Sequence, residues 1–80
     1  MPDAYATDLT RQEMKVLWLI AQGLSSKEIA RELGRSFCTI EIHAQVLQKK
    51  MHATTRAHAA AIAVGLGMVQ IVEPLRTQND

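Results

Sequence analysis

The chain has 80 residues, of which 48% are hydrophobic and 21% are charged, and its formal net charge at pH 7 is +1. This hydrophobic content is too high for a disordered segment, and no apolar run approaches the roughly 18 residues of a membrane-spanning helix. We therefore expect one small soluble domain, 1–80, for which self-association would add stability because a chain of this size buries little surface.

The first predicted helix covers roughly residues 11–22. Thr10 and Glu13 have the spacing of a capping box, in which each side chain bonds the backbone N–H group of the other residue. Apolar residues then recur at helical spacing until Gly23: Val16, Leu17, Ile20 and Ala21.

The next two predicted helices, about 26–33 and 37–51, have the layout of a helix-turn-helix. Ser25 and Glu28 have the spacing of a second capping box, which starts the first of them. Gly34 ends this helix, and Ser36 is a suitable N-cap for the second. Ile40, Ala44, Leu47 and Met51 should form the inward face of the second helix. A turn this short can set the helices at a steep angle, so the second could enter a DNA major groove. Any small helical domain with a short interhelical turn is the alternative.

A fourth helix is expected to start after Thr54 or Thr55 and to end near Gly65 or Gly67. It carries a stripe of small side chains: Ala57, Ala60, Ala61 and Val64. This stripe would allow close approach of an identical helix across a two-fold axis, or it could simply pack against the first helix. The apolar residues 68–72 could pack on the core, whereas residues 73–80 should form a flexible tail.

Basic residues are concentrated in the middle of the chain. Residues 25–56 hold six basic and three acidic side chains, a local net charge of +3, and the remaining residues hold three basic and five acidic side chains. Positive charge on the helix-turn-helix half is what phosphate binding through counterion release requires. A solvated helix face explains many clusters of this kind.

Many positions agree, in order and spacing, with one family. They are Leu9-Thr10-x-x-Glu13, Val16-Leu17, Ala21-x-Gly23-Leu24-Ser25, Lys27-Glu28-Ile29-Ala30, Leu33, Ser36-x-x-Thr39-Ile40, His43, Lys50-Met51 and Arg56. The chain resembles, over about residues 8–72, the DNA-binding domain of LuxR/GerE-type bacterial regulators. The resemblance implies an all-α, four-helix domain whose third helix reads the major groove and whose fourth helix forms the dimer contact. The chain looks like a stand-alone member or an excised domain.

The resemblance also implies site residues. Lys27 and Thr39 match phosphate-contacting positions, and both have the chemistry for it, near helix N-termini. Arg35 and Lys49, at opposite ends of the third helix, could reach the two phosphate walls of the groove. Base-reading positions are matched by Glu41, Ile42 and Gln45. The expected DNA contacts are thus Ser26, Lys27, Arg35, Thr39, Glu41, Ile42, Gln45 and Lys49, and the expected dimer contacts are Ala57, Ala60, Ala61 and Val64.

Two residues depart from the family pattern. Glu41 stands where lysine is usual and should repel phosphate, although a carboxylate can accept a hydrogen bond from cytosine N4. Val46 replaces a common polar residue and, with Ile42 one turn away, could meet thymine methyl groups. The exposed apolar side chains on this face, with Phe37 and Cys38, would also suit a protein partner. The alternative function is therefore a helix-turn-helix module that binds another regulator.

Other classes of function are not expected. His43, His52 and His58 are spaced too irregularly for ligands on one helix face, so we expect no metal and no cofactor. We also expect no enzymatic activity. The sequence shows no nucleophile with a neighbouring base, no glycine-rich phosphate loop and no paired carboxylates. Glu13 should meet a cation or an N–H group inside the domain. The sequence begins Met-Pro-Asp without a charged and then apolar leader, and its single cysteine, Cys38, cannot form an internal disulfide. Both observations favour the cytoplasm.

Overall fold

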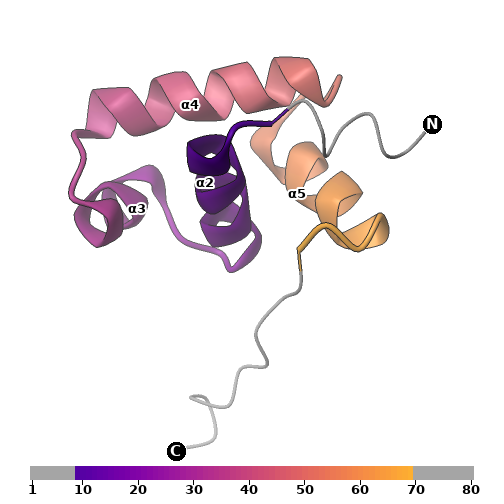
Figure 1. The fold of residues 1–80 in the computed structure, drawn as a ribbon, viewed down its shortest axis with the longest axis horizontal. Helices are drawn as coiled ribbons and strands as arrows, with labels where there is room; N and C mark the ends of the chain where they lie inside the picture. Colours follow the sequence, from indigo (N-terminus) through magenta and orange to yellow (C-terminus); the bar gives the residue numbers. More distant parts are fainter. Residues whose placement is uncertain (1–8, 70–80) are drawn as a thin grey trace, which may run out of the picture.

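The computed structural model describes residues 9–69. Within these residues the chain forms helices and no strands: α2, Arg11–Ala21; α3, Ser26–Leu33; α4, Phe37–Lys50; and α5, Arg56–Gly65 (Figure 1). The predicted all-α, four-helix arrangement is confirmed, and the predicted ends of the first and third helices were each one residue too late. The predicted tail, 73–80, and residues 70–72 lie outside the described residues.

Side-chain caps start all four of these helices. Thr10 with Glu13, and Ser25 with Glu28, form the two predicted capping boxes. The Ser36 hydroxyl accepts a hydrogen bond from the Thr39 backbone N–H at the start of α4. Of the two threonines considered for the last helix, Thr55 is the N-cap. These contacts join residues three apart, which is why the sequence alone predicts the helix starts well.

The turn between α3 and α4 depends on one left-handed residue. Gly34 has φ +67°, and the following backbone N–H, of Arg35, donates to the Ala30 carbonyl at 2.9 Å. The same arrangement ends α4, but there the left-handed residue is His52, with φ +55°, and the Ala53 N–H donates to the Gln48 carbonyl at 2.9 Å. Glycine adopts this conformation without the Cβ strain that a histidine bears, so the end of α4 lacks the usual sequence signal.

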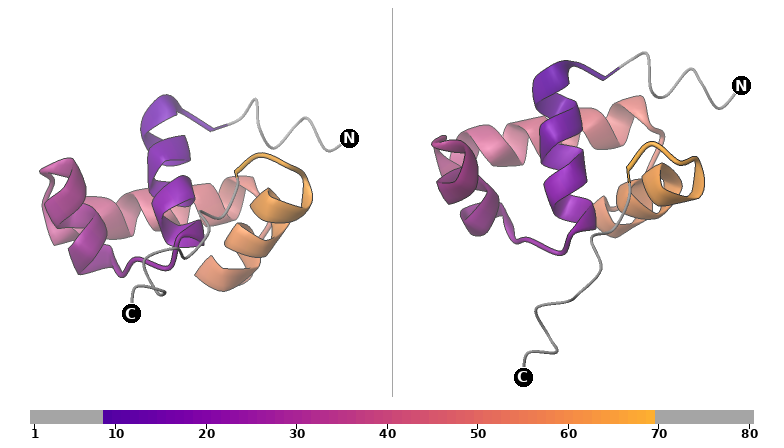
Figure 2. Two further views of the ribbon diagram at one scale, coloured as in Figure 1. Left: turned by 90° about the horizontal axis from the view of Figure 1, so that it is seen from below. Right: turned by 60° about the horizontal axis from the view of Figure 1, so that its bottom comes forward.

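The central element of the domain is α2. It packs against α3, α4 and α5, while α4 also packs against α3 and α5. Figure 1 shows α4 running along one side of the domain, with α3 and α5 at the two sides of α2. Both views in Figure 2 show α2 crossing α4 at a steep angle. The long helix α4, of 14 residues, is therefore supported from one side by the other three.

One hydrophobic core lies among the four helices. The four residues predicted for the inward face of α4 are all buried: Ile40, Ala44, Leu47 and Met51. Val16 and Leu17 of α2 and Ile29 of α3 meet them there. Trp18 of α2 is 40% exposed. In residues 9–69, none of the helices has the length and apolar character needed to cross a membrane.

The segment after α5 returns to this core. Val69 is buried and Met68 packs against the core cluster. The Met68 backbone N–H donates to the Ala63 carbonyl at 2.8 Å, which ends the helix and turns the chain back. The predicted packing of the apolar segment is thus confirmed for its first two residues.

Candidate nucleic-acid interface

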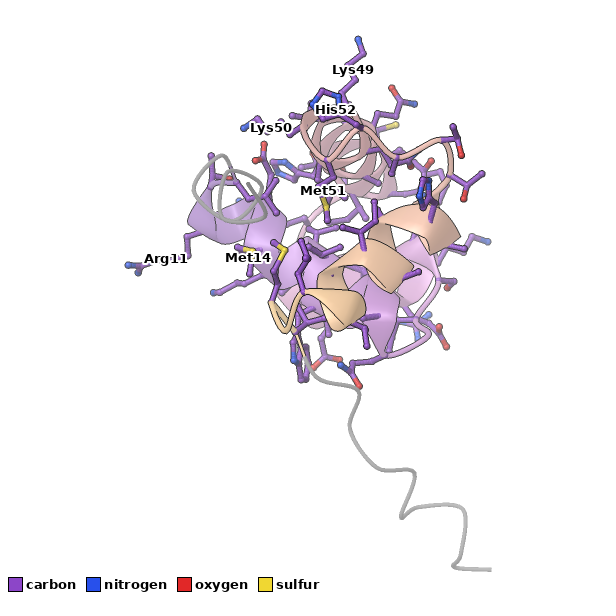
Figure 3. All side chains as sticks on the ribbon, turned by 90° about the vertical axis from the view of Figure 1, so that its right-hand side faces the viewer. Arg11, Met14, Lys49, Lys50, Met51 and His52 are labelled. Atoms are coloured by element: carbon purple, nitrogen blue, oxygen red, sulfur yellow. The ribbon has the colours of Figure 1, made fainter. Side chains whose placement is uncertain are left out.

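The outer side of α4 is open to solvent. Ile42 is 60% exposed, Gln45 and Lys49 are exposed, and Val46 is half-buried. Figure 3 shows the Lys49 side chain extending away from the body of the domain, whereas Met51 points into it. Since the opposite side of α4 is anchored in the core, the helix presents these outer side chains on a rigid support.

Basic and polar side chains border this outer surface at both ends. Arg35 is exposed just before α4 and Lys49 is exposed in its last turn, some 20 Å away along the helix axis at 1.5 Å per residue. Lys27 is exposed in the first turn of α3. The Thr39 hydroxyl accepts a hydrogen bond from the Ser36 hydroxyl at 2.9 Å. Positive charge therefore lies at both ends of the candidate DNA-facing helix.

Two of the expected DNA-contacting residues, Ser26 and Glu41, form a hydrogen bond with each other. The Ser26 hydroxyl donates to Glu41 Oε2, and Ser26 is only 5% exposed. Arg56 completes a three-residue cluster: its Nη2 lies 2.9 Å from Glu41 Oε2 and its Nη1 lies 2.6 Å from Ser26 Oγ. We call Ser26, Glu41 and Arg56 the flank cluster. It joins the first residues of α3 and α5 to the second turn of α4.

The flank cluster stabilises the charged form of Glu41. The hydrogen bond from Ser26, followed by the bond and the positive charge of Arg56, holds the pKa of the Glu41 carboxyl below its ordinary value, and these effects outweigh the opposing effect of partial burial. The carboxylate is thus an ion with a partner at neutral pH. Sequence reasoning noted Arg56 only as a charged family position and did not pair it with Glu41.

Glu13 has the internal partners that the sequence predicted. Lys50 Nζ lies 2.8 Å from its Oε1, and the Thr10 backbone N–H donates to the same oxygen at 3.0 Å. Burial alone would raise the pKa of the Glu13 carboxyl, but the Lys50 and Thr10 hydrogen bonds and the Lys50 charge together lower it. This pair ties the last turn of α4 to the first turn of α2, at the opposite end of α4 from Arg35.

The small-residue stripe of α5 is mostly open. Ala57, Ala61 and Val64 are exposed and Ala60 is half-buried, whereas Ala59 and Ala63 are the α5 alanines that pack into the core. The stripe lines a shallow groove of about 450 Å³ together with Ala21 and Gly65. Within the described residues Ala57, Ala61 and Val64 are therefore not covered by α2, whereas Ala60 packs against the core.

No group of three histidine, cysteine or acidic side chains in residues 9–69 is placed to hold a metal ion. Cys38 is a free, exposed thiol.

Comparison with known proteins agrees with this architecture. Residues 7–63 match the family described as bacterial regulatory proteins, luxR family. The chain is 42% identical over 64 residues to the transcriptional regulatory protein MctR of Rhizobium johnstonii, covering 80% of this chain and 30% of that protein. It is 44% identical over 52 residues to the nitrate/nitrite response regulator NarL of Escherichia coli, covering 65% and 24% respectively.

The quorum-sensing regulator RhlR of Pseudomonas aeruginosa is 39% identical over 61 residues, or 76% of this chain and 25% of that protein. The chain spans 30% or less of the length of these three relatives. The matched part of the chain includes all of α2, α3 and α4 and most of α5. The chain belongs to the LuxR family, as a helix-turn-helix DNA-binding domain of the kind found in non-enzymatic bacterial transcription regulators.

Proposed function

We propose that this domain binds duplex DNA in the bacterial cytoplasm by placing the outer side of α4 in the major groove, and so regulates transcription. The observation that carries the proposal is the open outer side of α4, bordered by Arg35 and Lys49 while its inner side is buried. The major groove is wide enough to admit one α-helix. The cations at its ends then lie where the phosphate backbones pass.

Individual roles follow from side-chain chemistry. Gln45 can bond an adenine edge through its amide, and Ile42 with Val46 offers an apolar surface to thymine methyl groups. Lys27, Arg35, Thr39 and Lys49 are the proposed phosphate contacts, which fix orientation without reading sequence. Specific recognition thus depends on a few residues in the middle of α4, and affinity depends on the cations around them.

Replacing Lys27 with alanine should weaken binding to a duplex by about five- to tenfold and should reduce the slope of log affinity against log salt by roughly 0.9, because one phosphate contact is lost. Fluorescence anisotropy with a labelled duplex, measured over a series of salt concentrations, would give both quantities. Lys15→Ala is the matched control, since Lys15 is an exposed lysine of α2 and is not one of the proposed phosphate contacts.

Binding by the unchanged chain that does not weaken as salt rises would contradict the proposal. The exposed apolar side chains of Phe37 and Ile42 would then be the place to look for a protein partner, because Ile42 is 60% exposed and Phe37 is 47% exposed. In that case Ile42→Asp should abolish capture of the partner and leave the unfolding transition unchanged.

We further propose that two copies of the chain pair through the small-residue stripe of α5, as the exposure of Ala57, Ala61 and Val64 supports. Paired copies would read half-sites about 34–36 Å apart, one turn of DNA.

Ala61→Glu should abolish this pairing, since two carboxylates would face each other across the two-fold axis. Sedimentation equilibrium measures the effect, with Gln12→Glu on α2 as the control; a dimer that survives Ala61→Glu would place the contact elsewhere.

A further inference from the structure

Glu41 lies on α4 between a core residue and a groove-facing residue. Ile40 before it is fully buried, and Ile42 after it is 60% exposed. Successive helix residues are 100° apart, so the Glu41 side chain leaves the helix at the edge of the proposed DNA surface. About a third of this side chain, 35%, is exposed. If α4 lies in the major groove, an unpartnered carboxylate at this edge would repel the DNA phosphates.

The structure supplies that carboxylate with a cation from another helix. Arg56 Nη2 bonds Glu41 Oε2 at 2.9 Å, and Ser26 bonds the same oxygen from α3. Both partners are the first residues of their helices, so the caps at Ser25 and Thr55 fix where they lie. The arrangement holds one negative and one positive charge close together, so the pair itself carries no net charge.

We propose that the positive charge of Arg56 offsets the negative charge of Glu41 when α4 meets DNA. The flank cluster thereby removes the repulsion between the glutamate and the DNA phosphates. This inference rests on the proposed function, because it concerns how α4 meets a duplex. It assigns Glu41 a part other than base reading: its carboxylate is turned toward Ser26 and Arg56. It also gives Arg56 an electrostatic part in DNA binding without requiring Arg56 to touch phosphate.

The cluster should affect DNA binding more than it affects folding. Both charged side chains are about one-third exposed, 35% for Glu41 and 32% for Arg56, and exposed ion pairs contribute little to stability. Each charge interacts much more strongly with the many phosphates of a nearby DNA duplex, and salt screens this interaction. DNA affinity at low salt is therefore the sensitive measure.

A three-variant cycle in the full 80-residue chain tests the proposal: Glu41→Gln, Arg56→Met, and the double variant. The probe is a duplex of mixed sequence, about 30 base pairs long, in low salt. Arg56→Met should weaken binding about fivefold because the carboxylate is left unpaired, and Glu41→Gln should tighten it about fivefold because the guanidinium is left unpaired. The double variant should return to within about twofold of the unchanged chain. Added salt should reduce all of these differences.

The opposite signs of the two single effects distinguish this proposal from its competitors. If the cluster only supports the fold, both single variants weaken binding and lower the melting temperature together. If Arg56 itself contacts phosphate, the double variant binds well below the unchanged chain, because replacing Glu41 does not restore the lost phosphate contact. Either result would overturn the inference.

One further variant completes the experiment. Arg11→Met removes an exposed cation of α2, which Figure 3 shows extending away from the body of the domain, and it should change affinity much less than Arg56→Met. Should Arg56→Met fail to fold, the isosteric Glu41→Gln decides alone, because unchanged affinity in that variant contradicts the inference. Failure of the proposed function looks different: the unchanged chain would then show no salt-dependent binding at all.

Discussion

Leu47→Ala is expected to lower the free energy of unfolding by about 2–5 kcal/mol, the cost of removing a large buried side chain and leaving a cavity. Leu47 is fully buried on the inward face of α4, in the core that α2, α3 and α5 also line. Small domains have total stabilities near the lower end of about 5–15 kcal/mol, so much of this domain's stability would be lost. Urea denaturation followed by circular dichroism measures the loss, and DNA binding should fall with the folded fraction.

Gln45→Ala provides the matched control for Leu47→Ala. Gln45 lies on the same helix but is exposed, so its replacement should change the unfolding free energy by less than about 0.5 kcal/mol. The two variants should therefore separate stability from recognition, because Gln45→Ala should lose DNA affinity while it stays folded. A Leu47→Ala chain as stable as the unchanged one would mean that α4 does not pack on the core through this face.

Glu13→Gln is expected to cost about 1–2 kcal/mol at pH 7, since it weakens charged hydrogen bonds at a largely buried position. Glu13 is 6% exposed and bonds both Lys50 and the Thr10 backbone. This cost is below the about 3–5 kcal/mol expected for breaking a fully buried ion pair, because 30% of the Lys50 side chain is exposed and water can solvate it. Glu28→Gln, a capping glutamate with an exposed side chain, should have a smaller effect.

The effect of Glu13→Gln should also depend on pH. The folded-state pKa of Glu13 is lower than its ordinary value of 4.5, so its charged form stabilises the fold fully above that value. As pH falls through the lowered pKa, the folded carboxylate takes up a proton and this stabilisation is lost. The stability difference between the unchanged chain and Glu13→Gln should therefore shrink in acid. Other titrating groups, including Glu41, are common to both chains and cancel, and a constant difference down to pH 2 would contradict the role given to the Lys50 pair.

Local features of the fold were predictable from the sequence and distant ones were not. Capping contacts such as that of Thr10 with Glu13 span one helical turn, so spacing alone identifies them. A cation or N–H partner for Glu13 was predicted, but the identity of Lys50, 37 residues along the chain, required the packing of α4 on α2. The end of α4 was placed one residue late because His52, rather than a glycine, adopts the left-handed conformation there.

The flank cluster shows a second limit of sequence reasoning. A helical period separates inward from outward positions, but Glu41 lies between the two, and a rotation of a few tens of degrees decides whether its side chain faces DNA or a neighbouring helix. Its partners come from 15 residues away on either side, Ser26 and Arg56. The alanines of α5 pose a related problem. Because their side chains are identical, the sequence does not indicate which of them are buried and which are exposed.

The central position of α2 has a practical consequence for anyone who wishes to shorten this molecule. Both halves of the helix-turn-helix use α2 as part of their packing surface, and α5 is joined to them largely through it. A peptide reduced to α3 and α4 would expose the apolar residues that α2 now shields, and helices of 8 and 14 residues are marginal by themselves in water. Folding should be all-or-none, and the reading helix should exist only while the entire scaffold does.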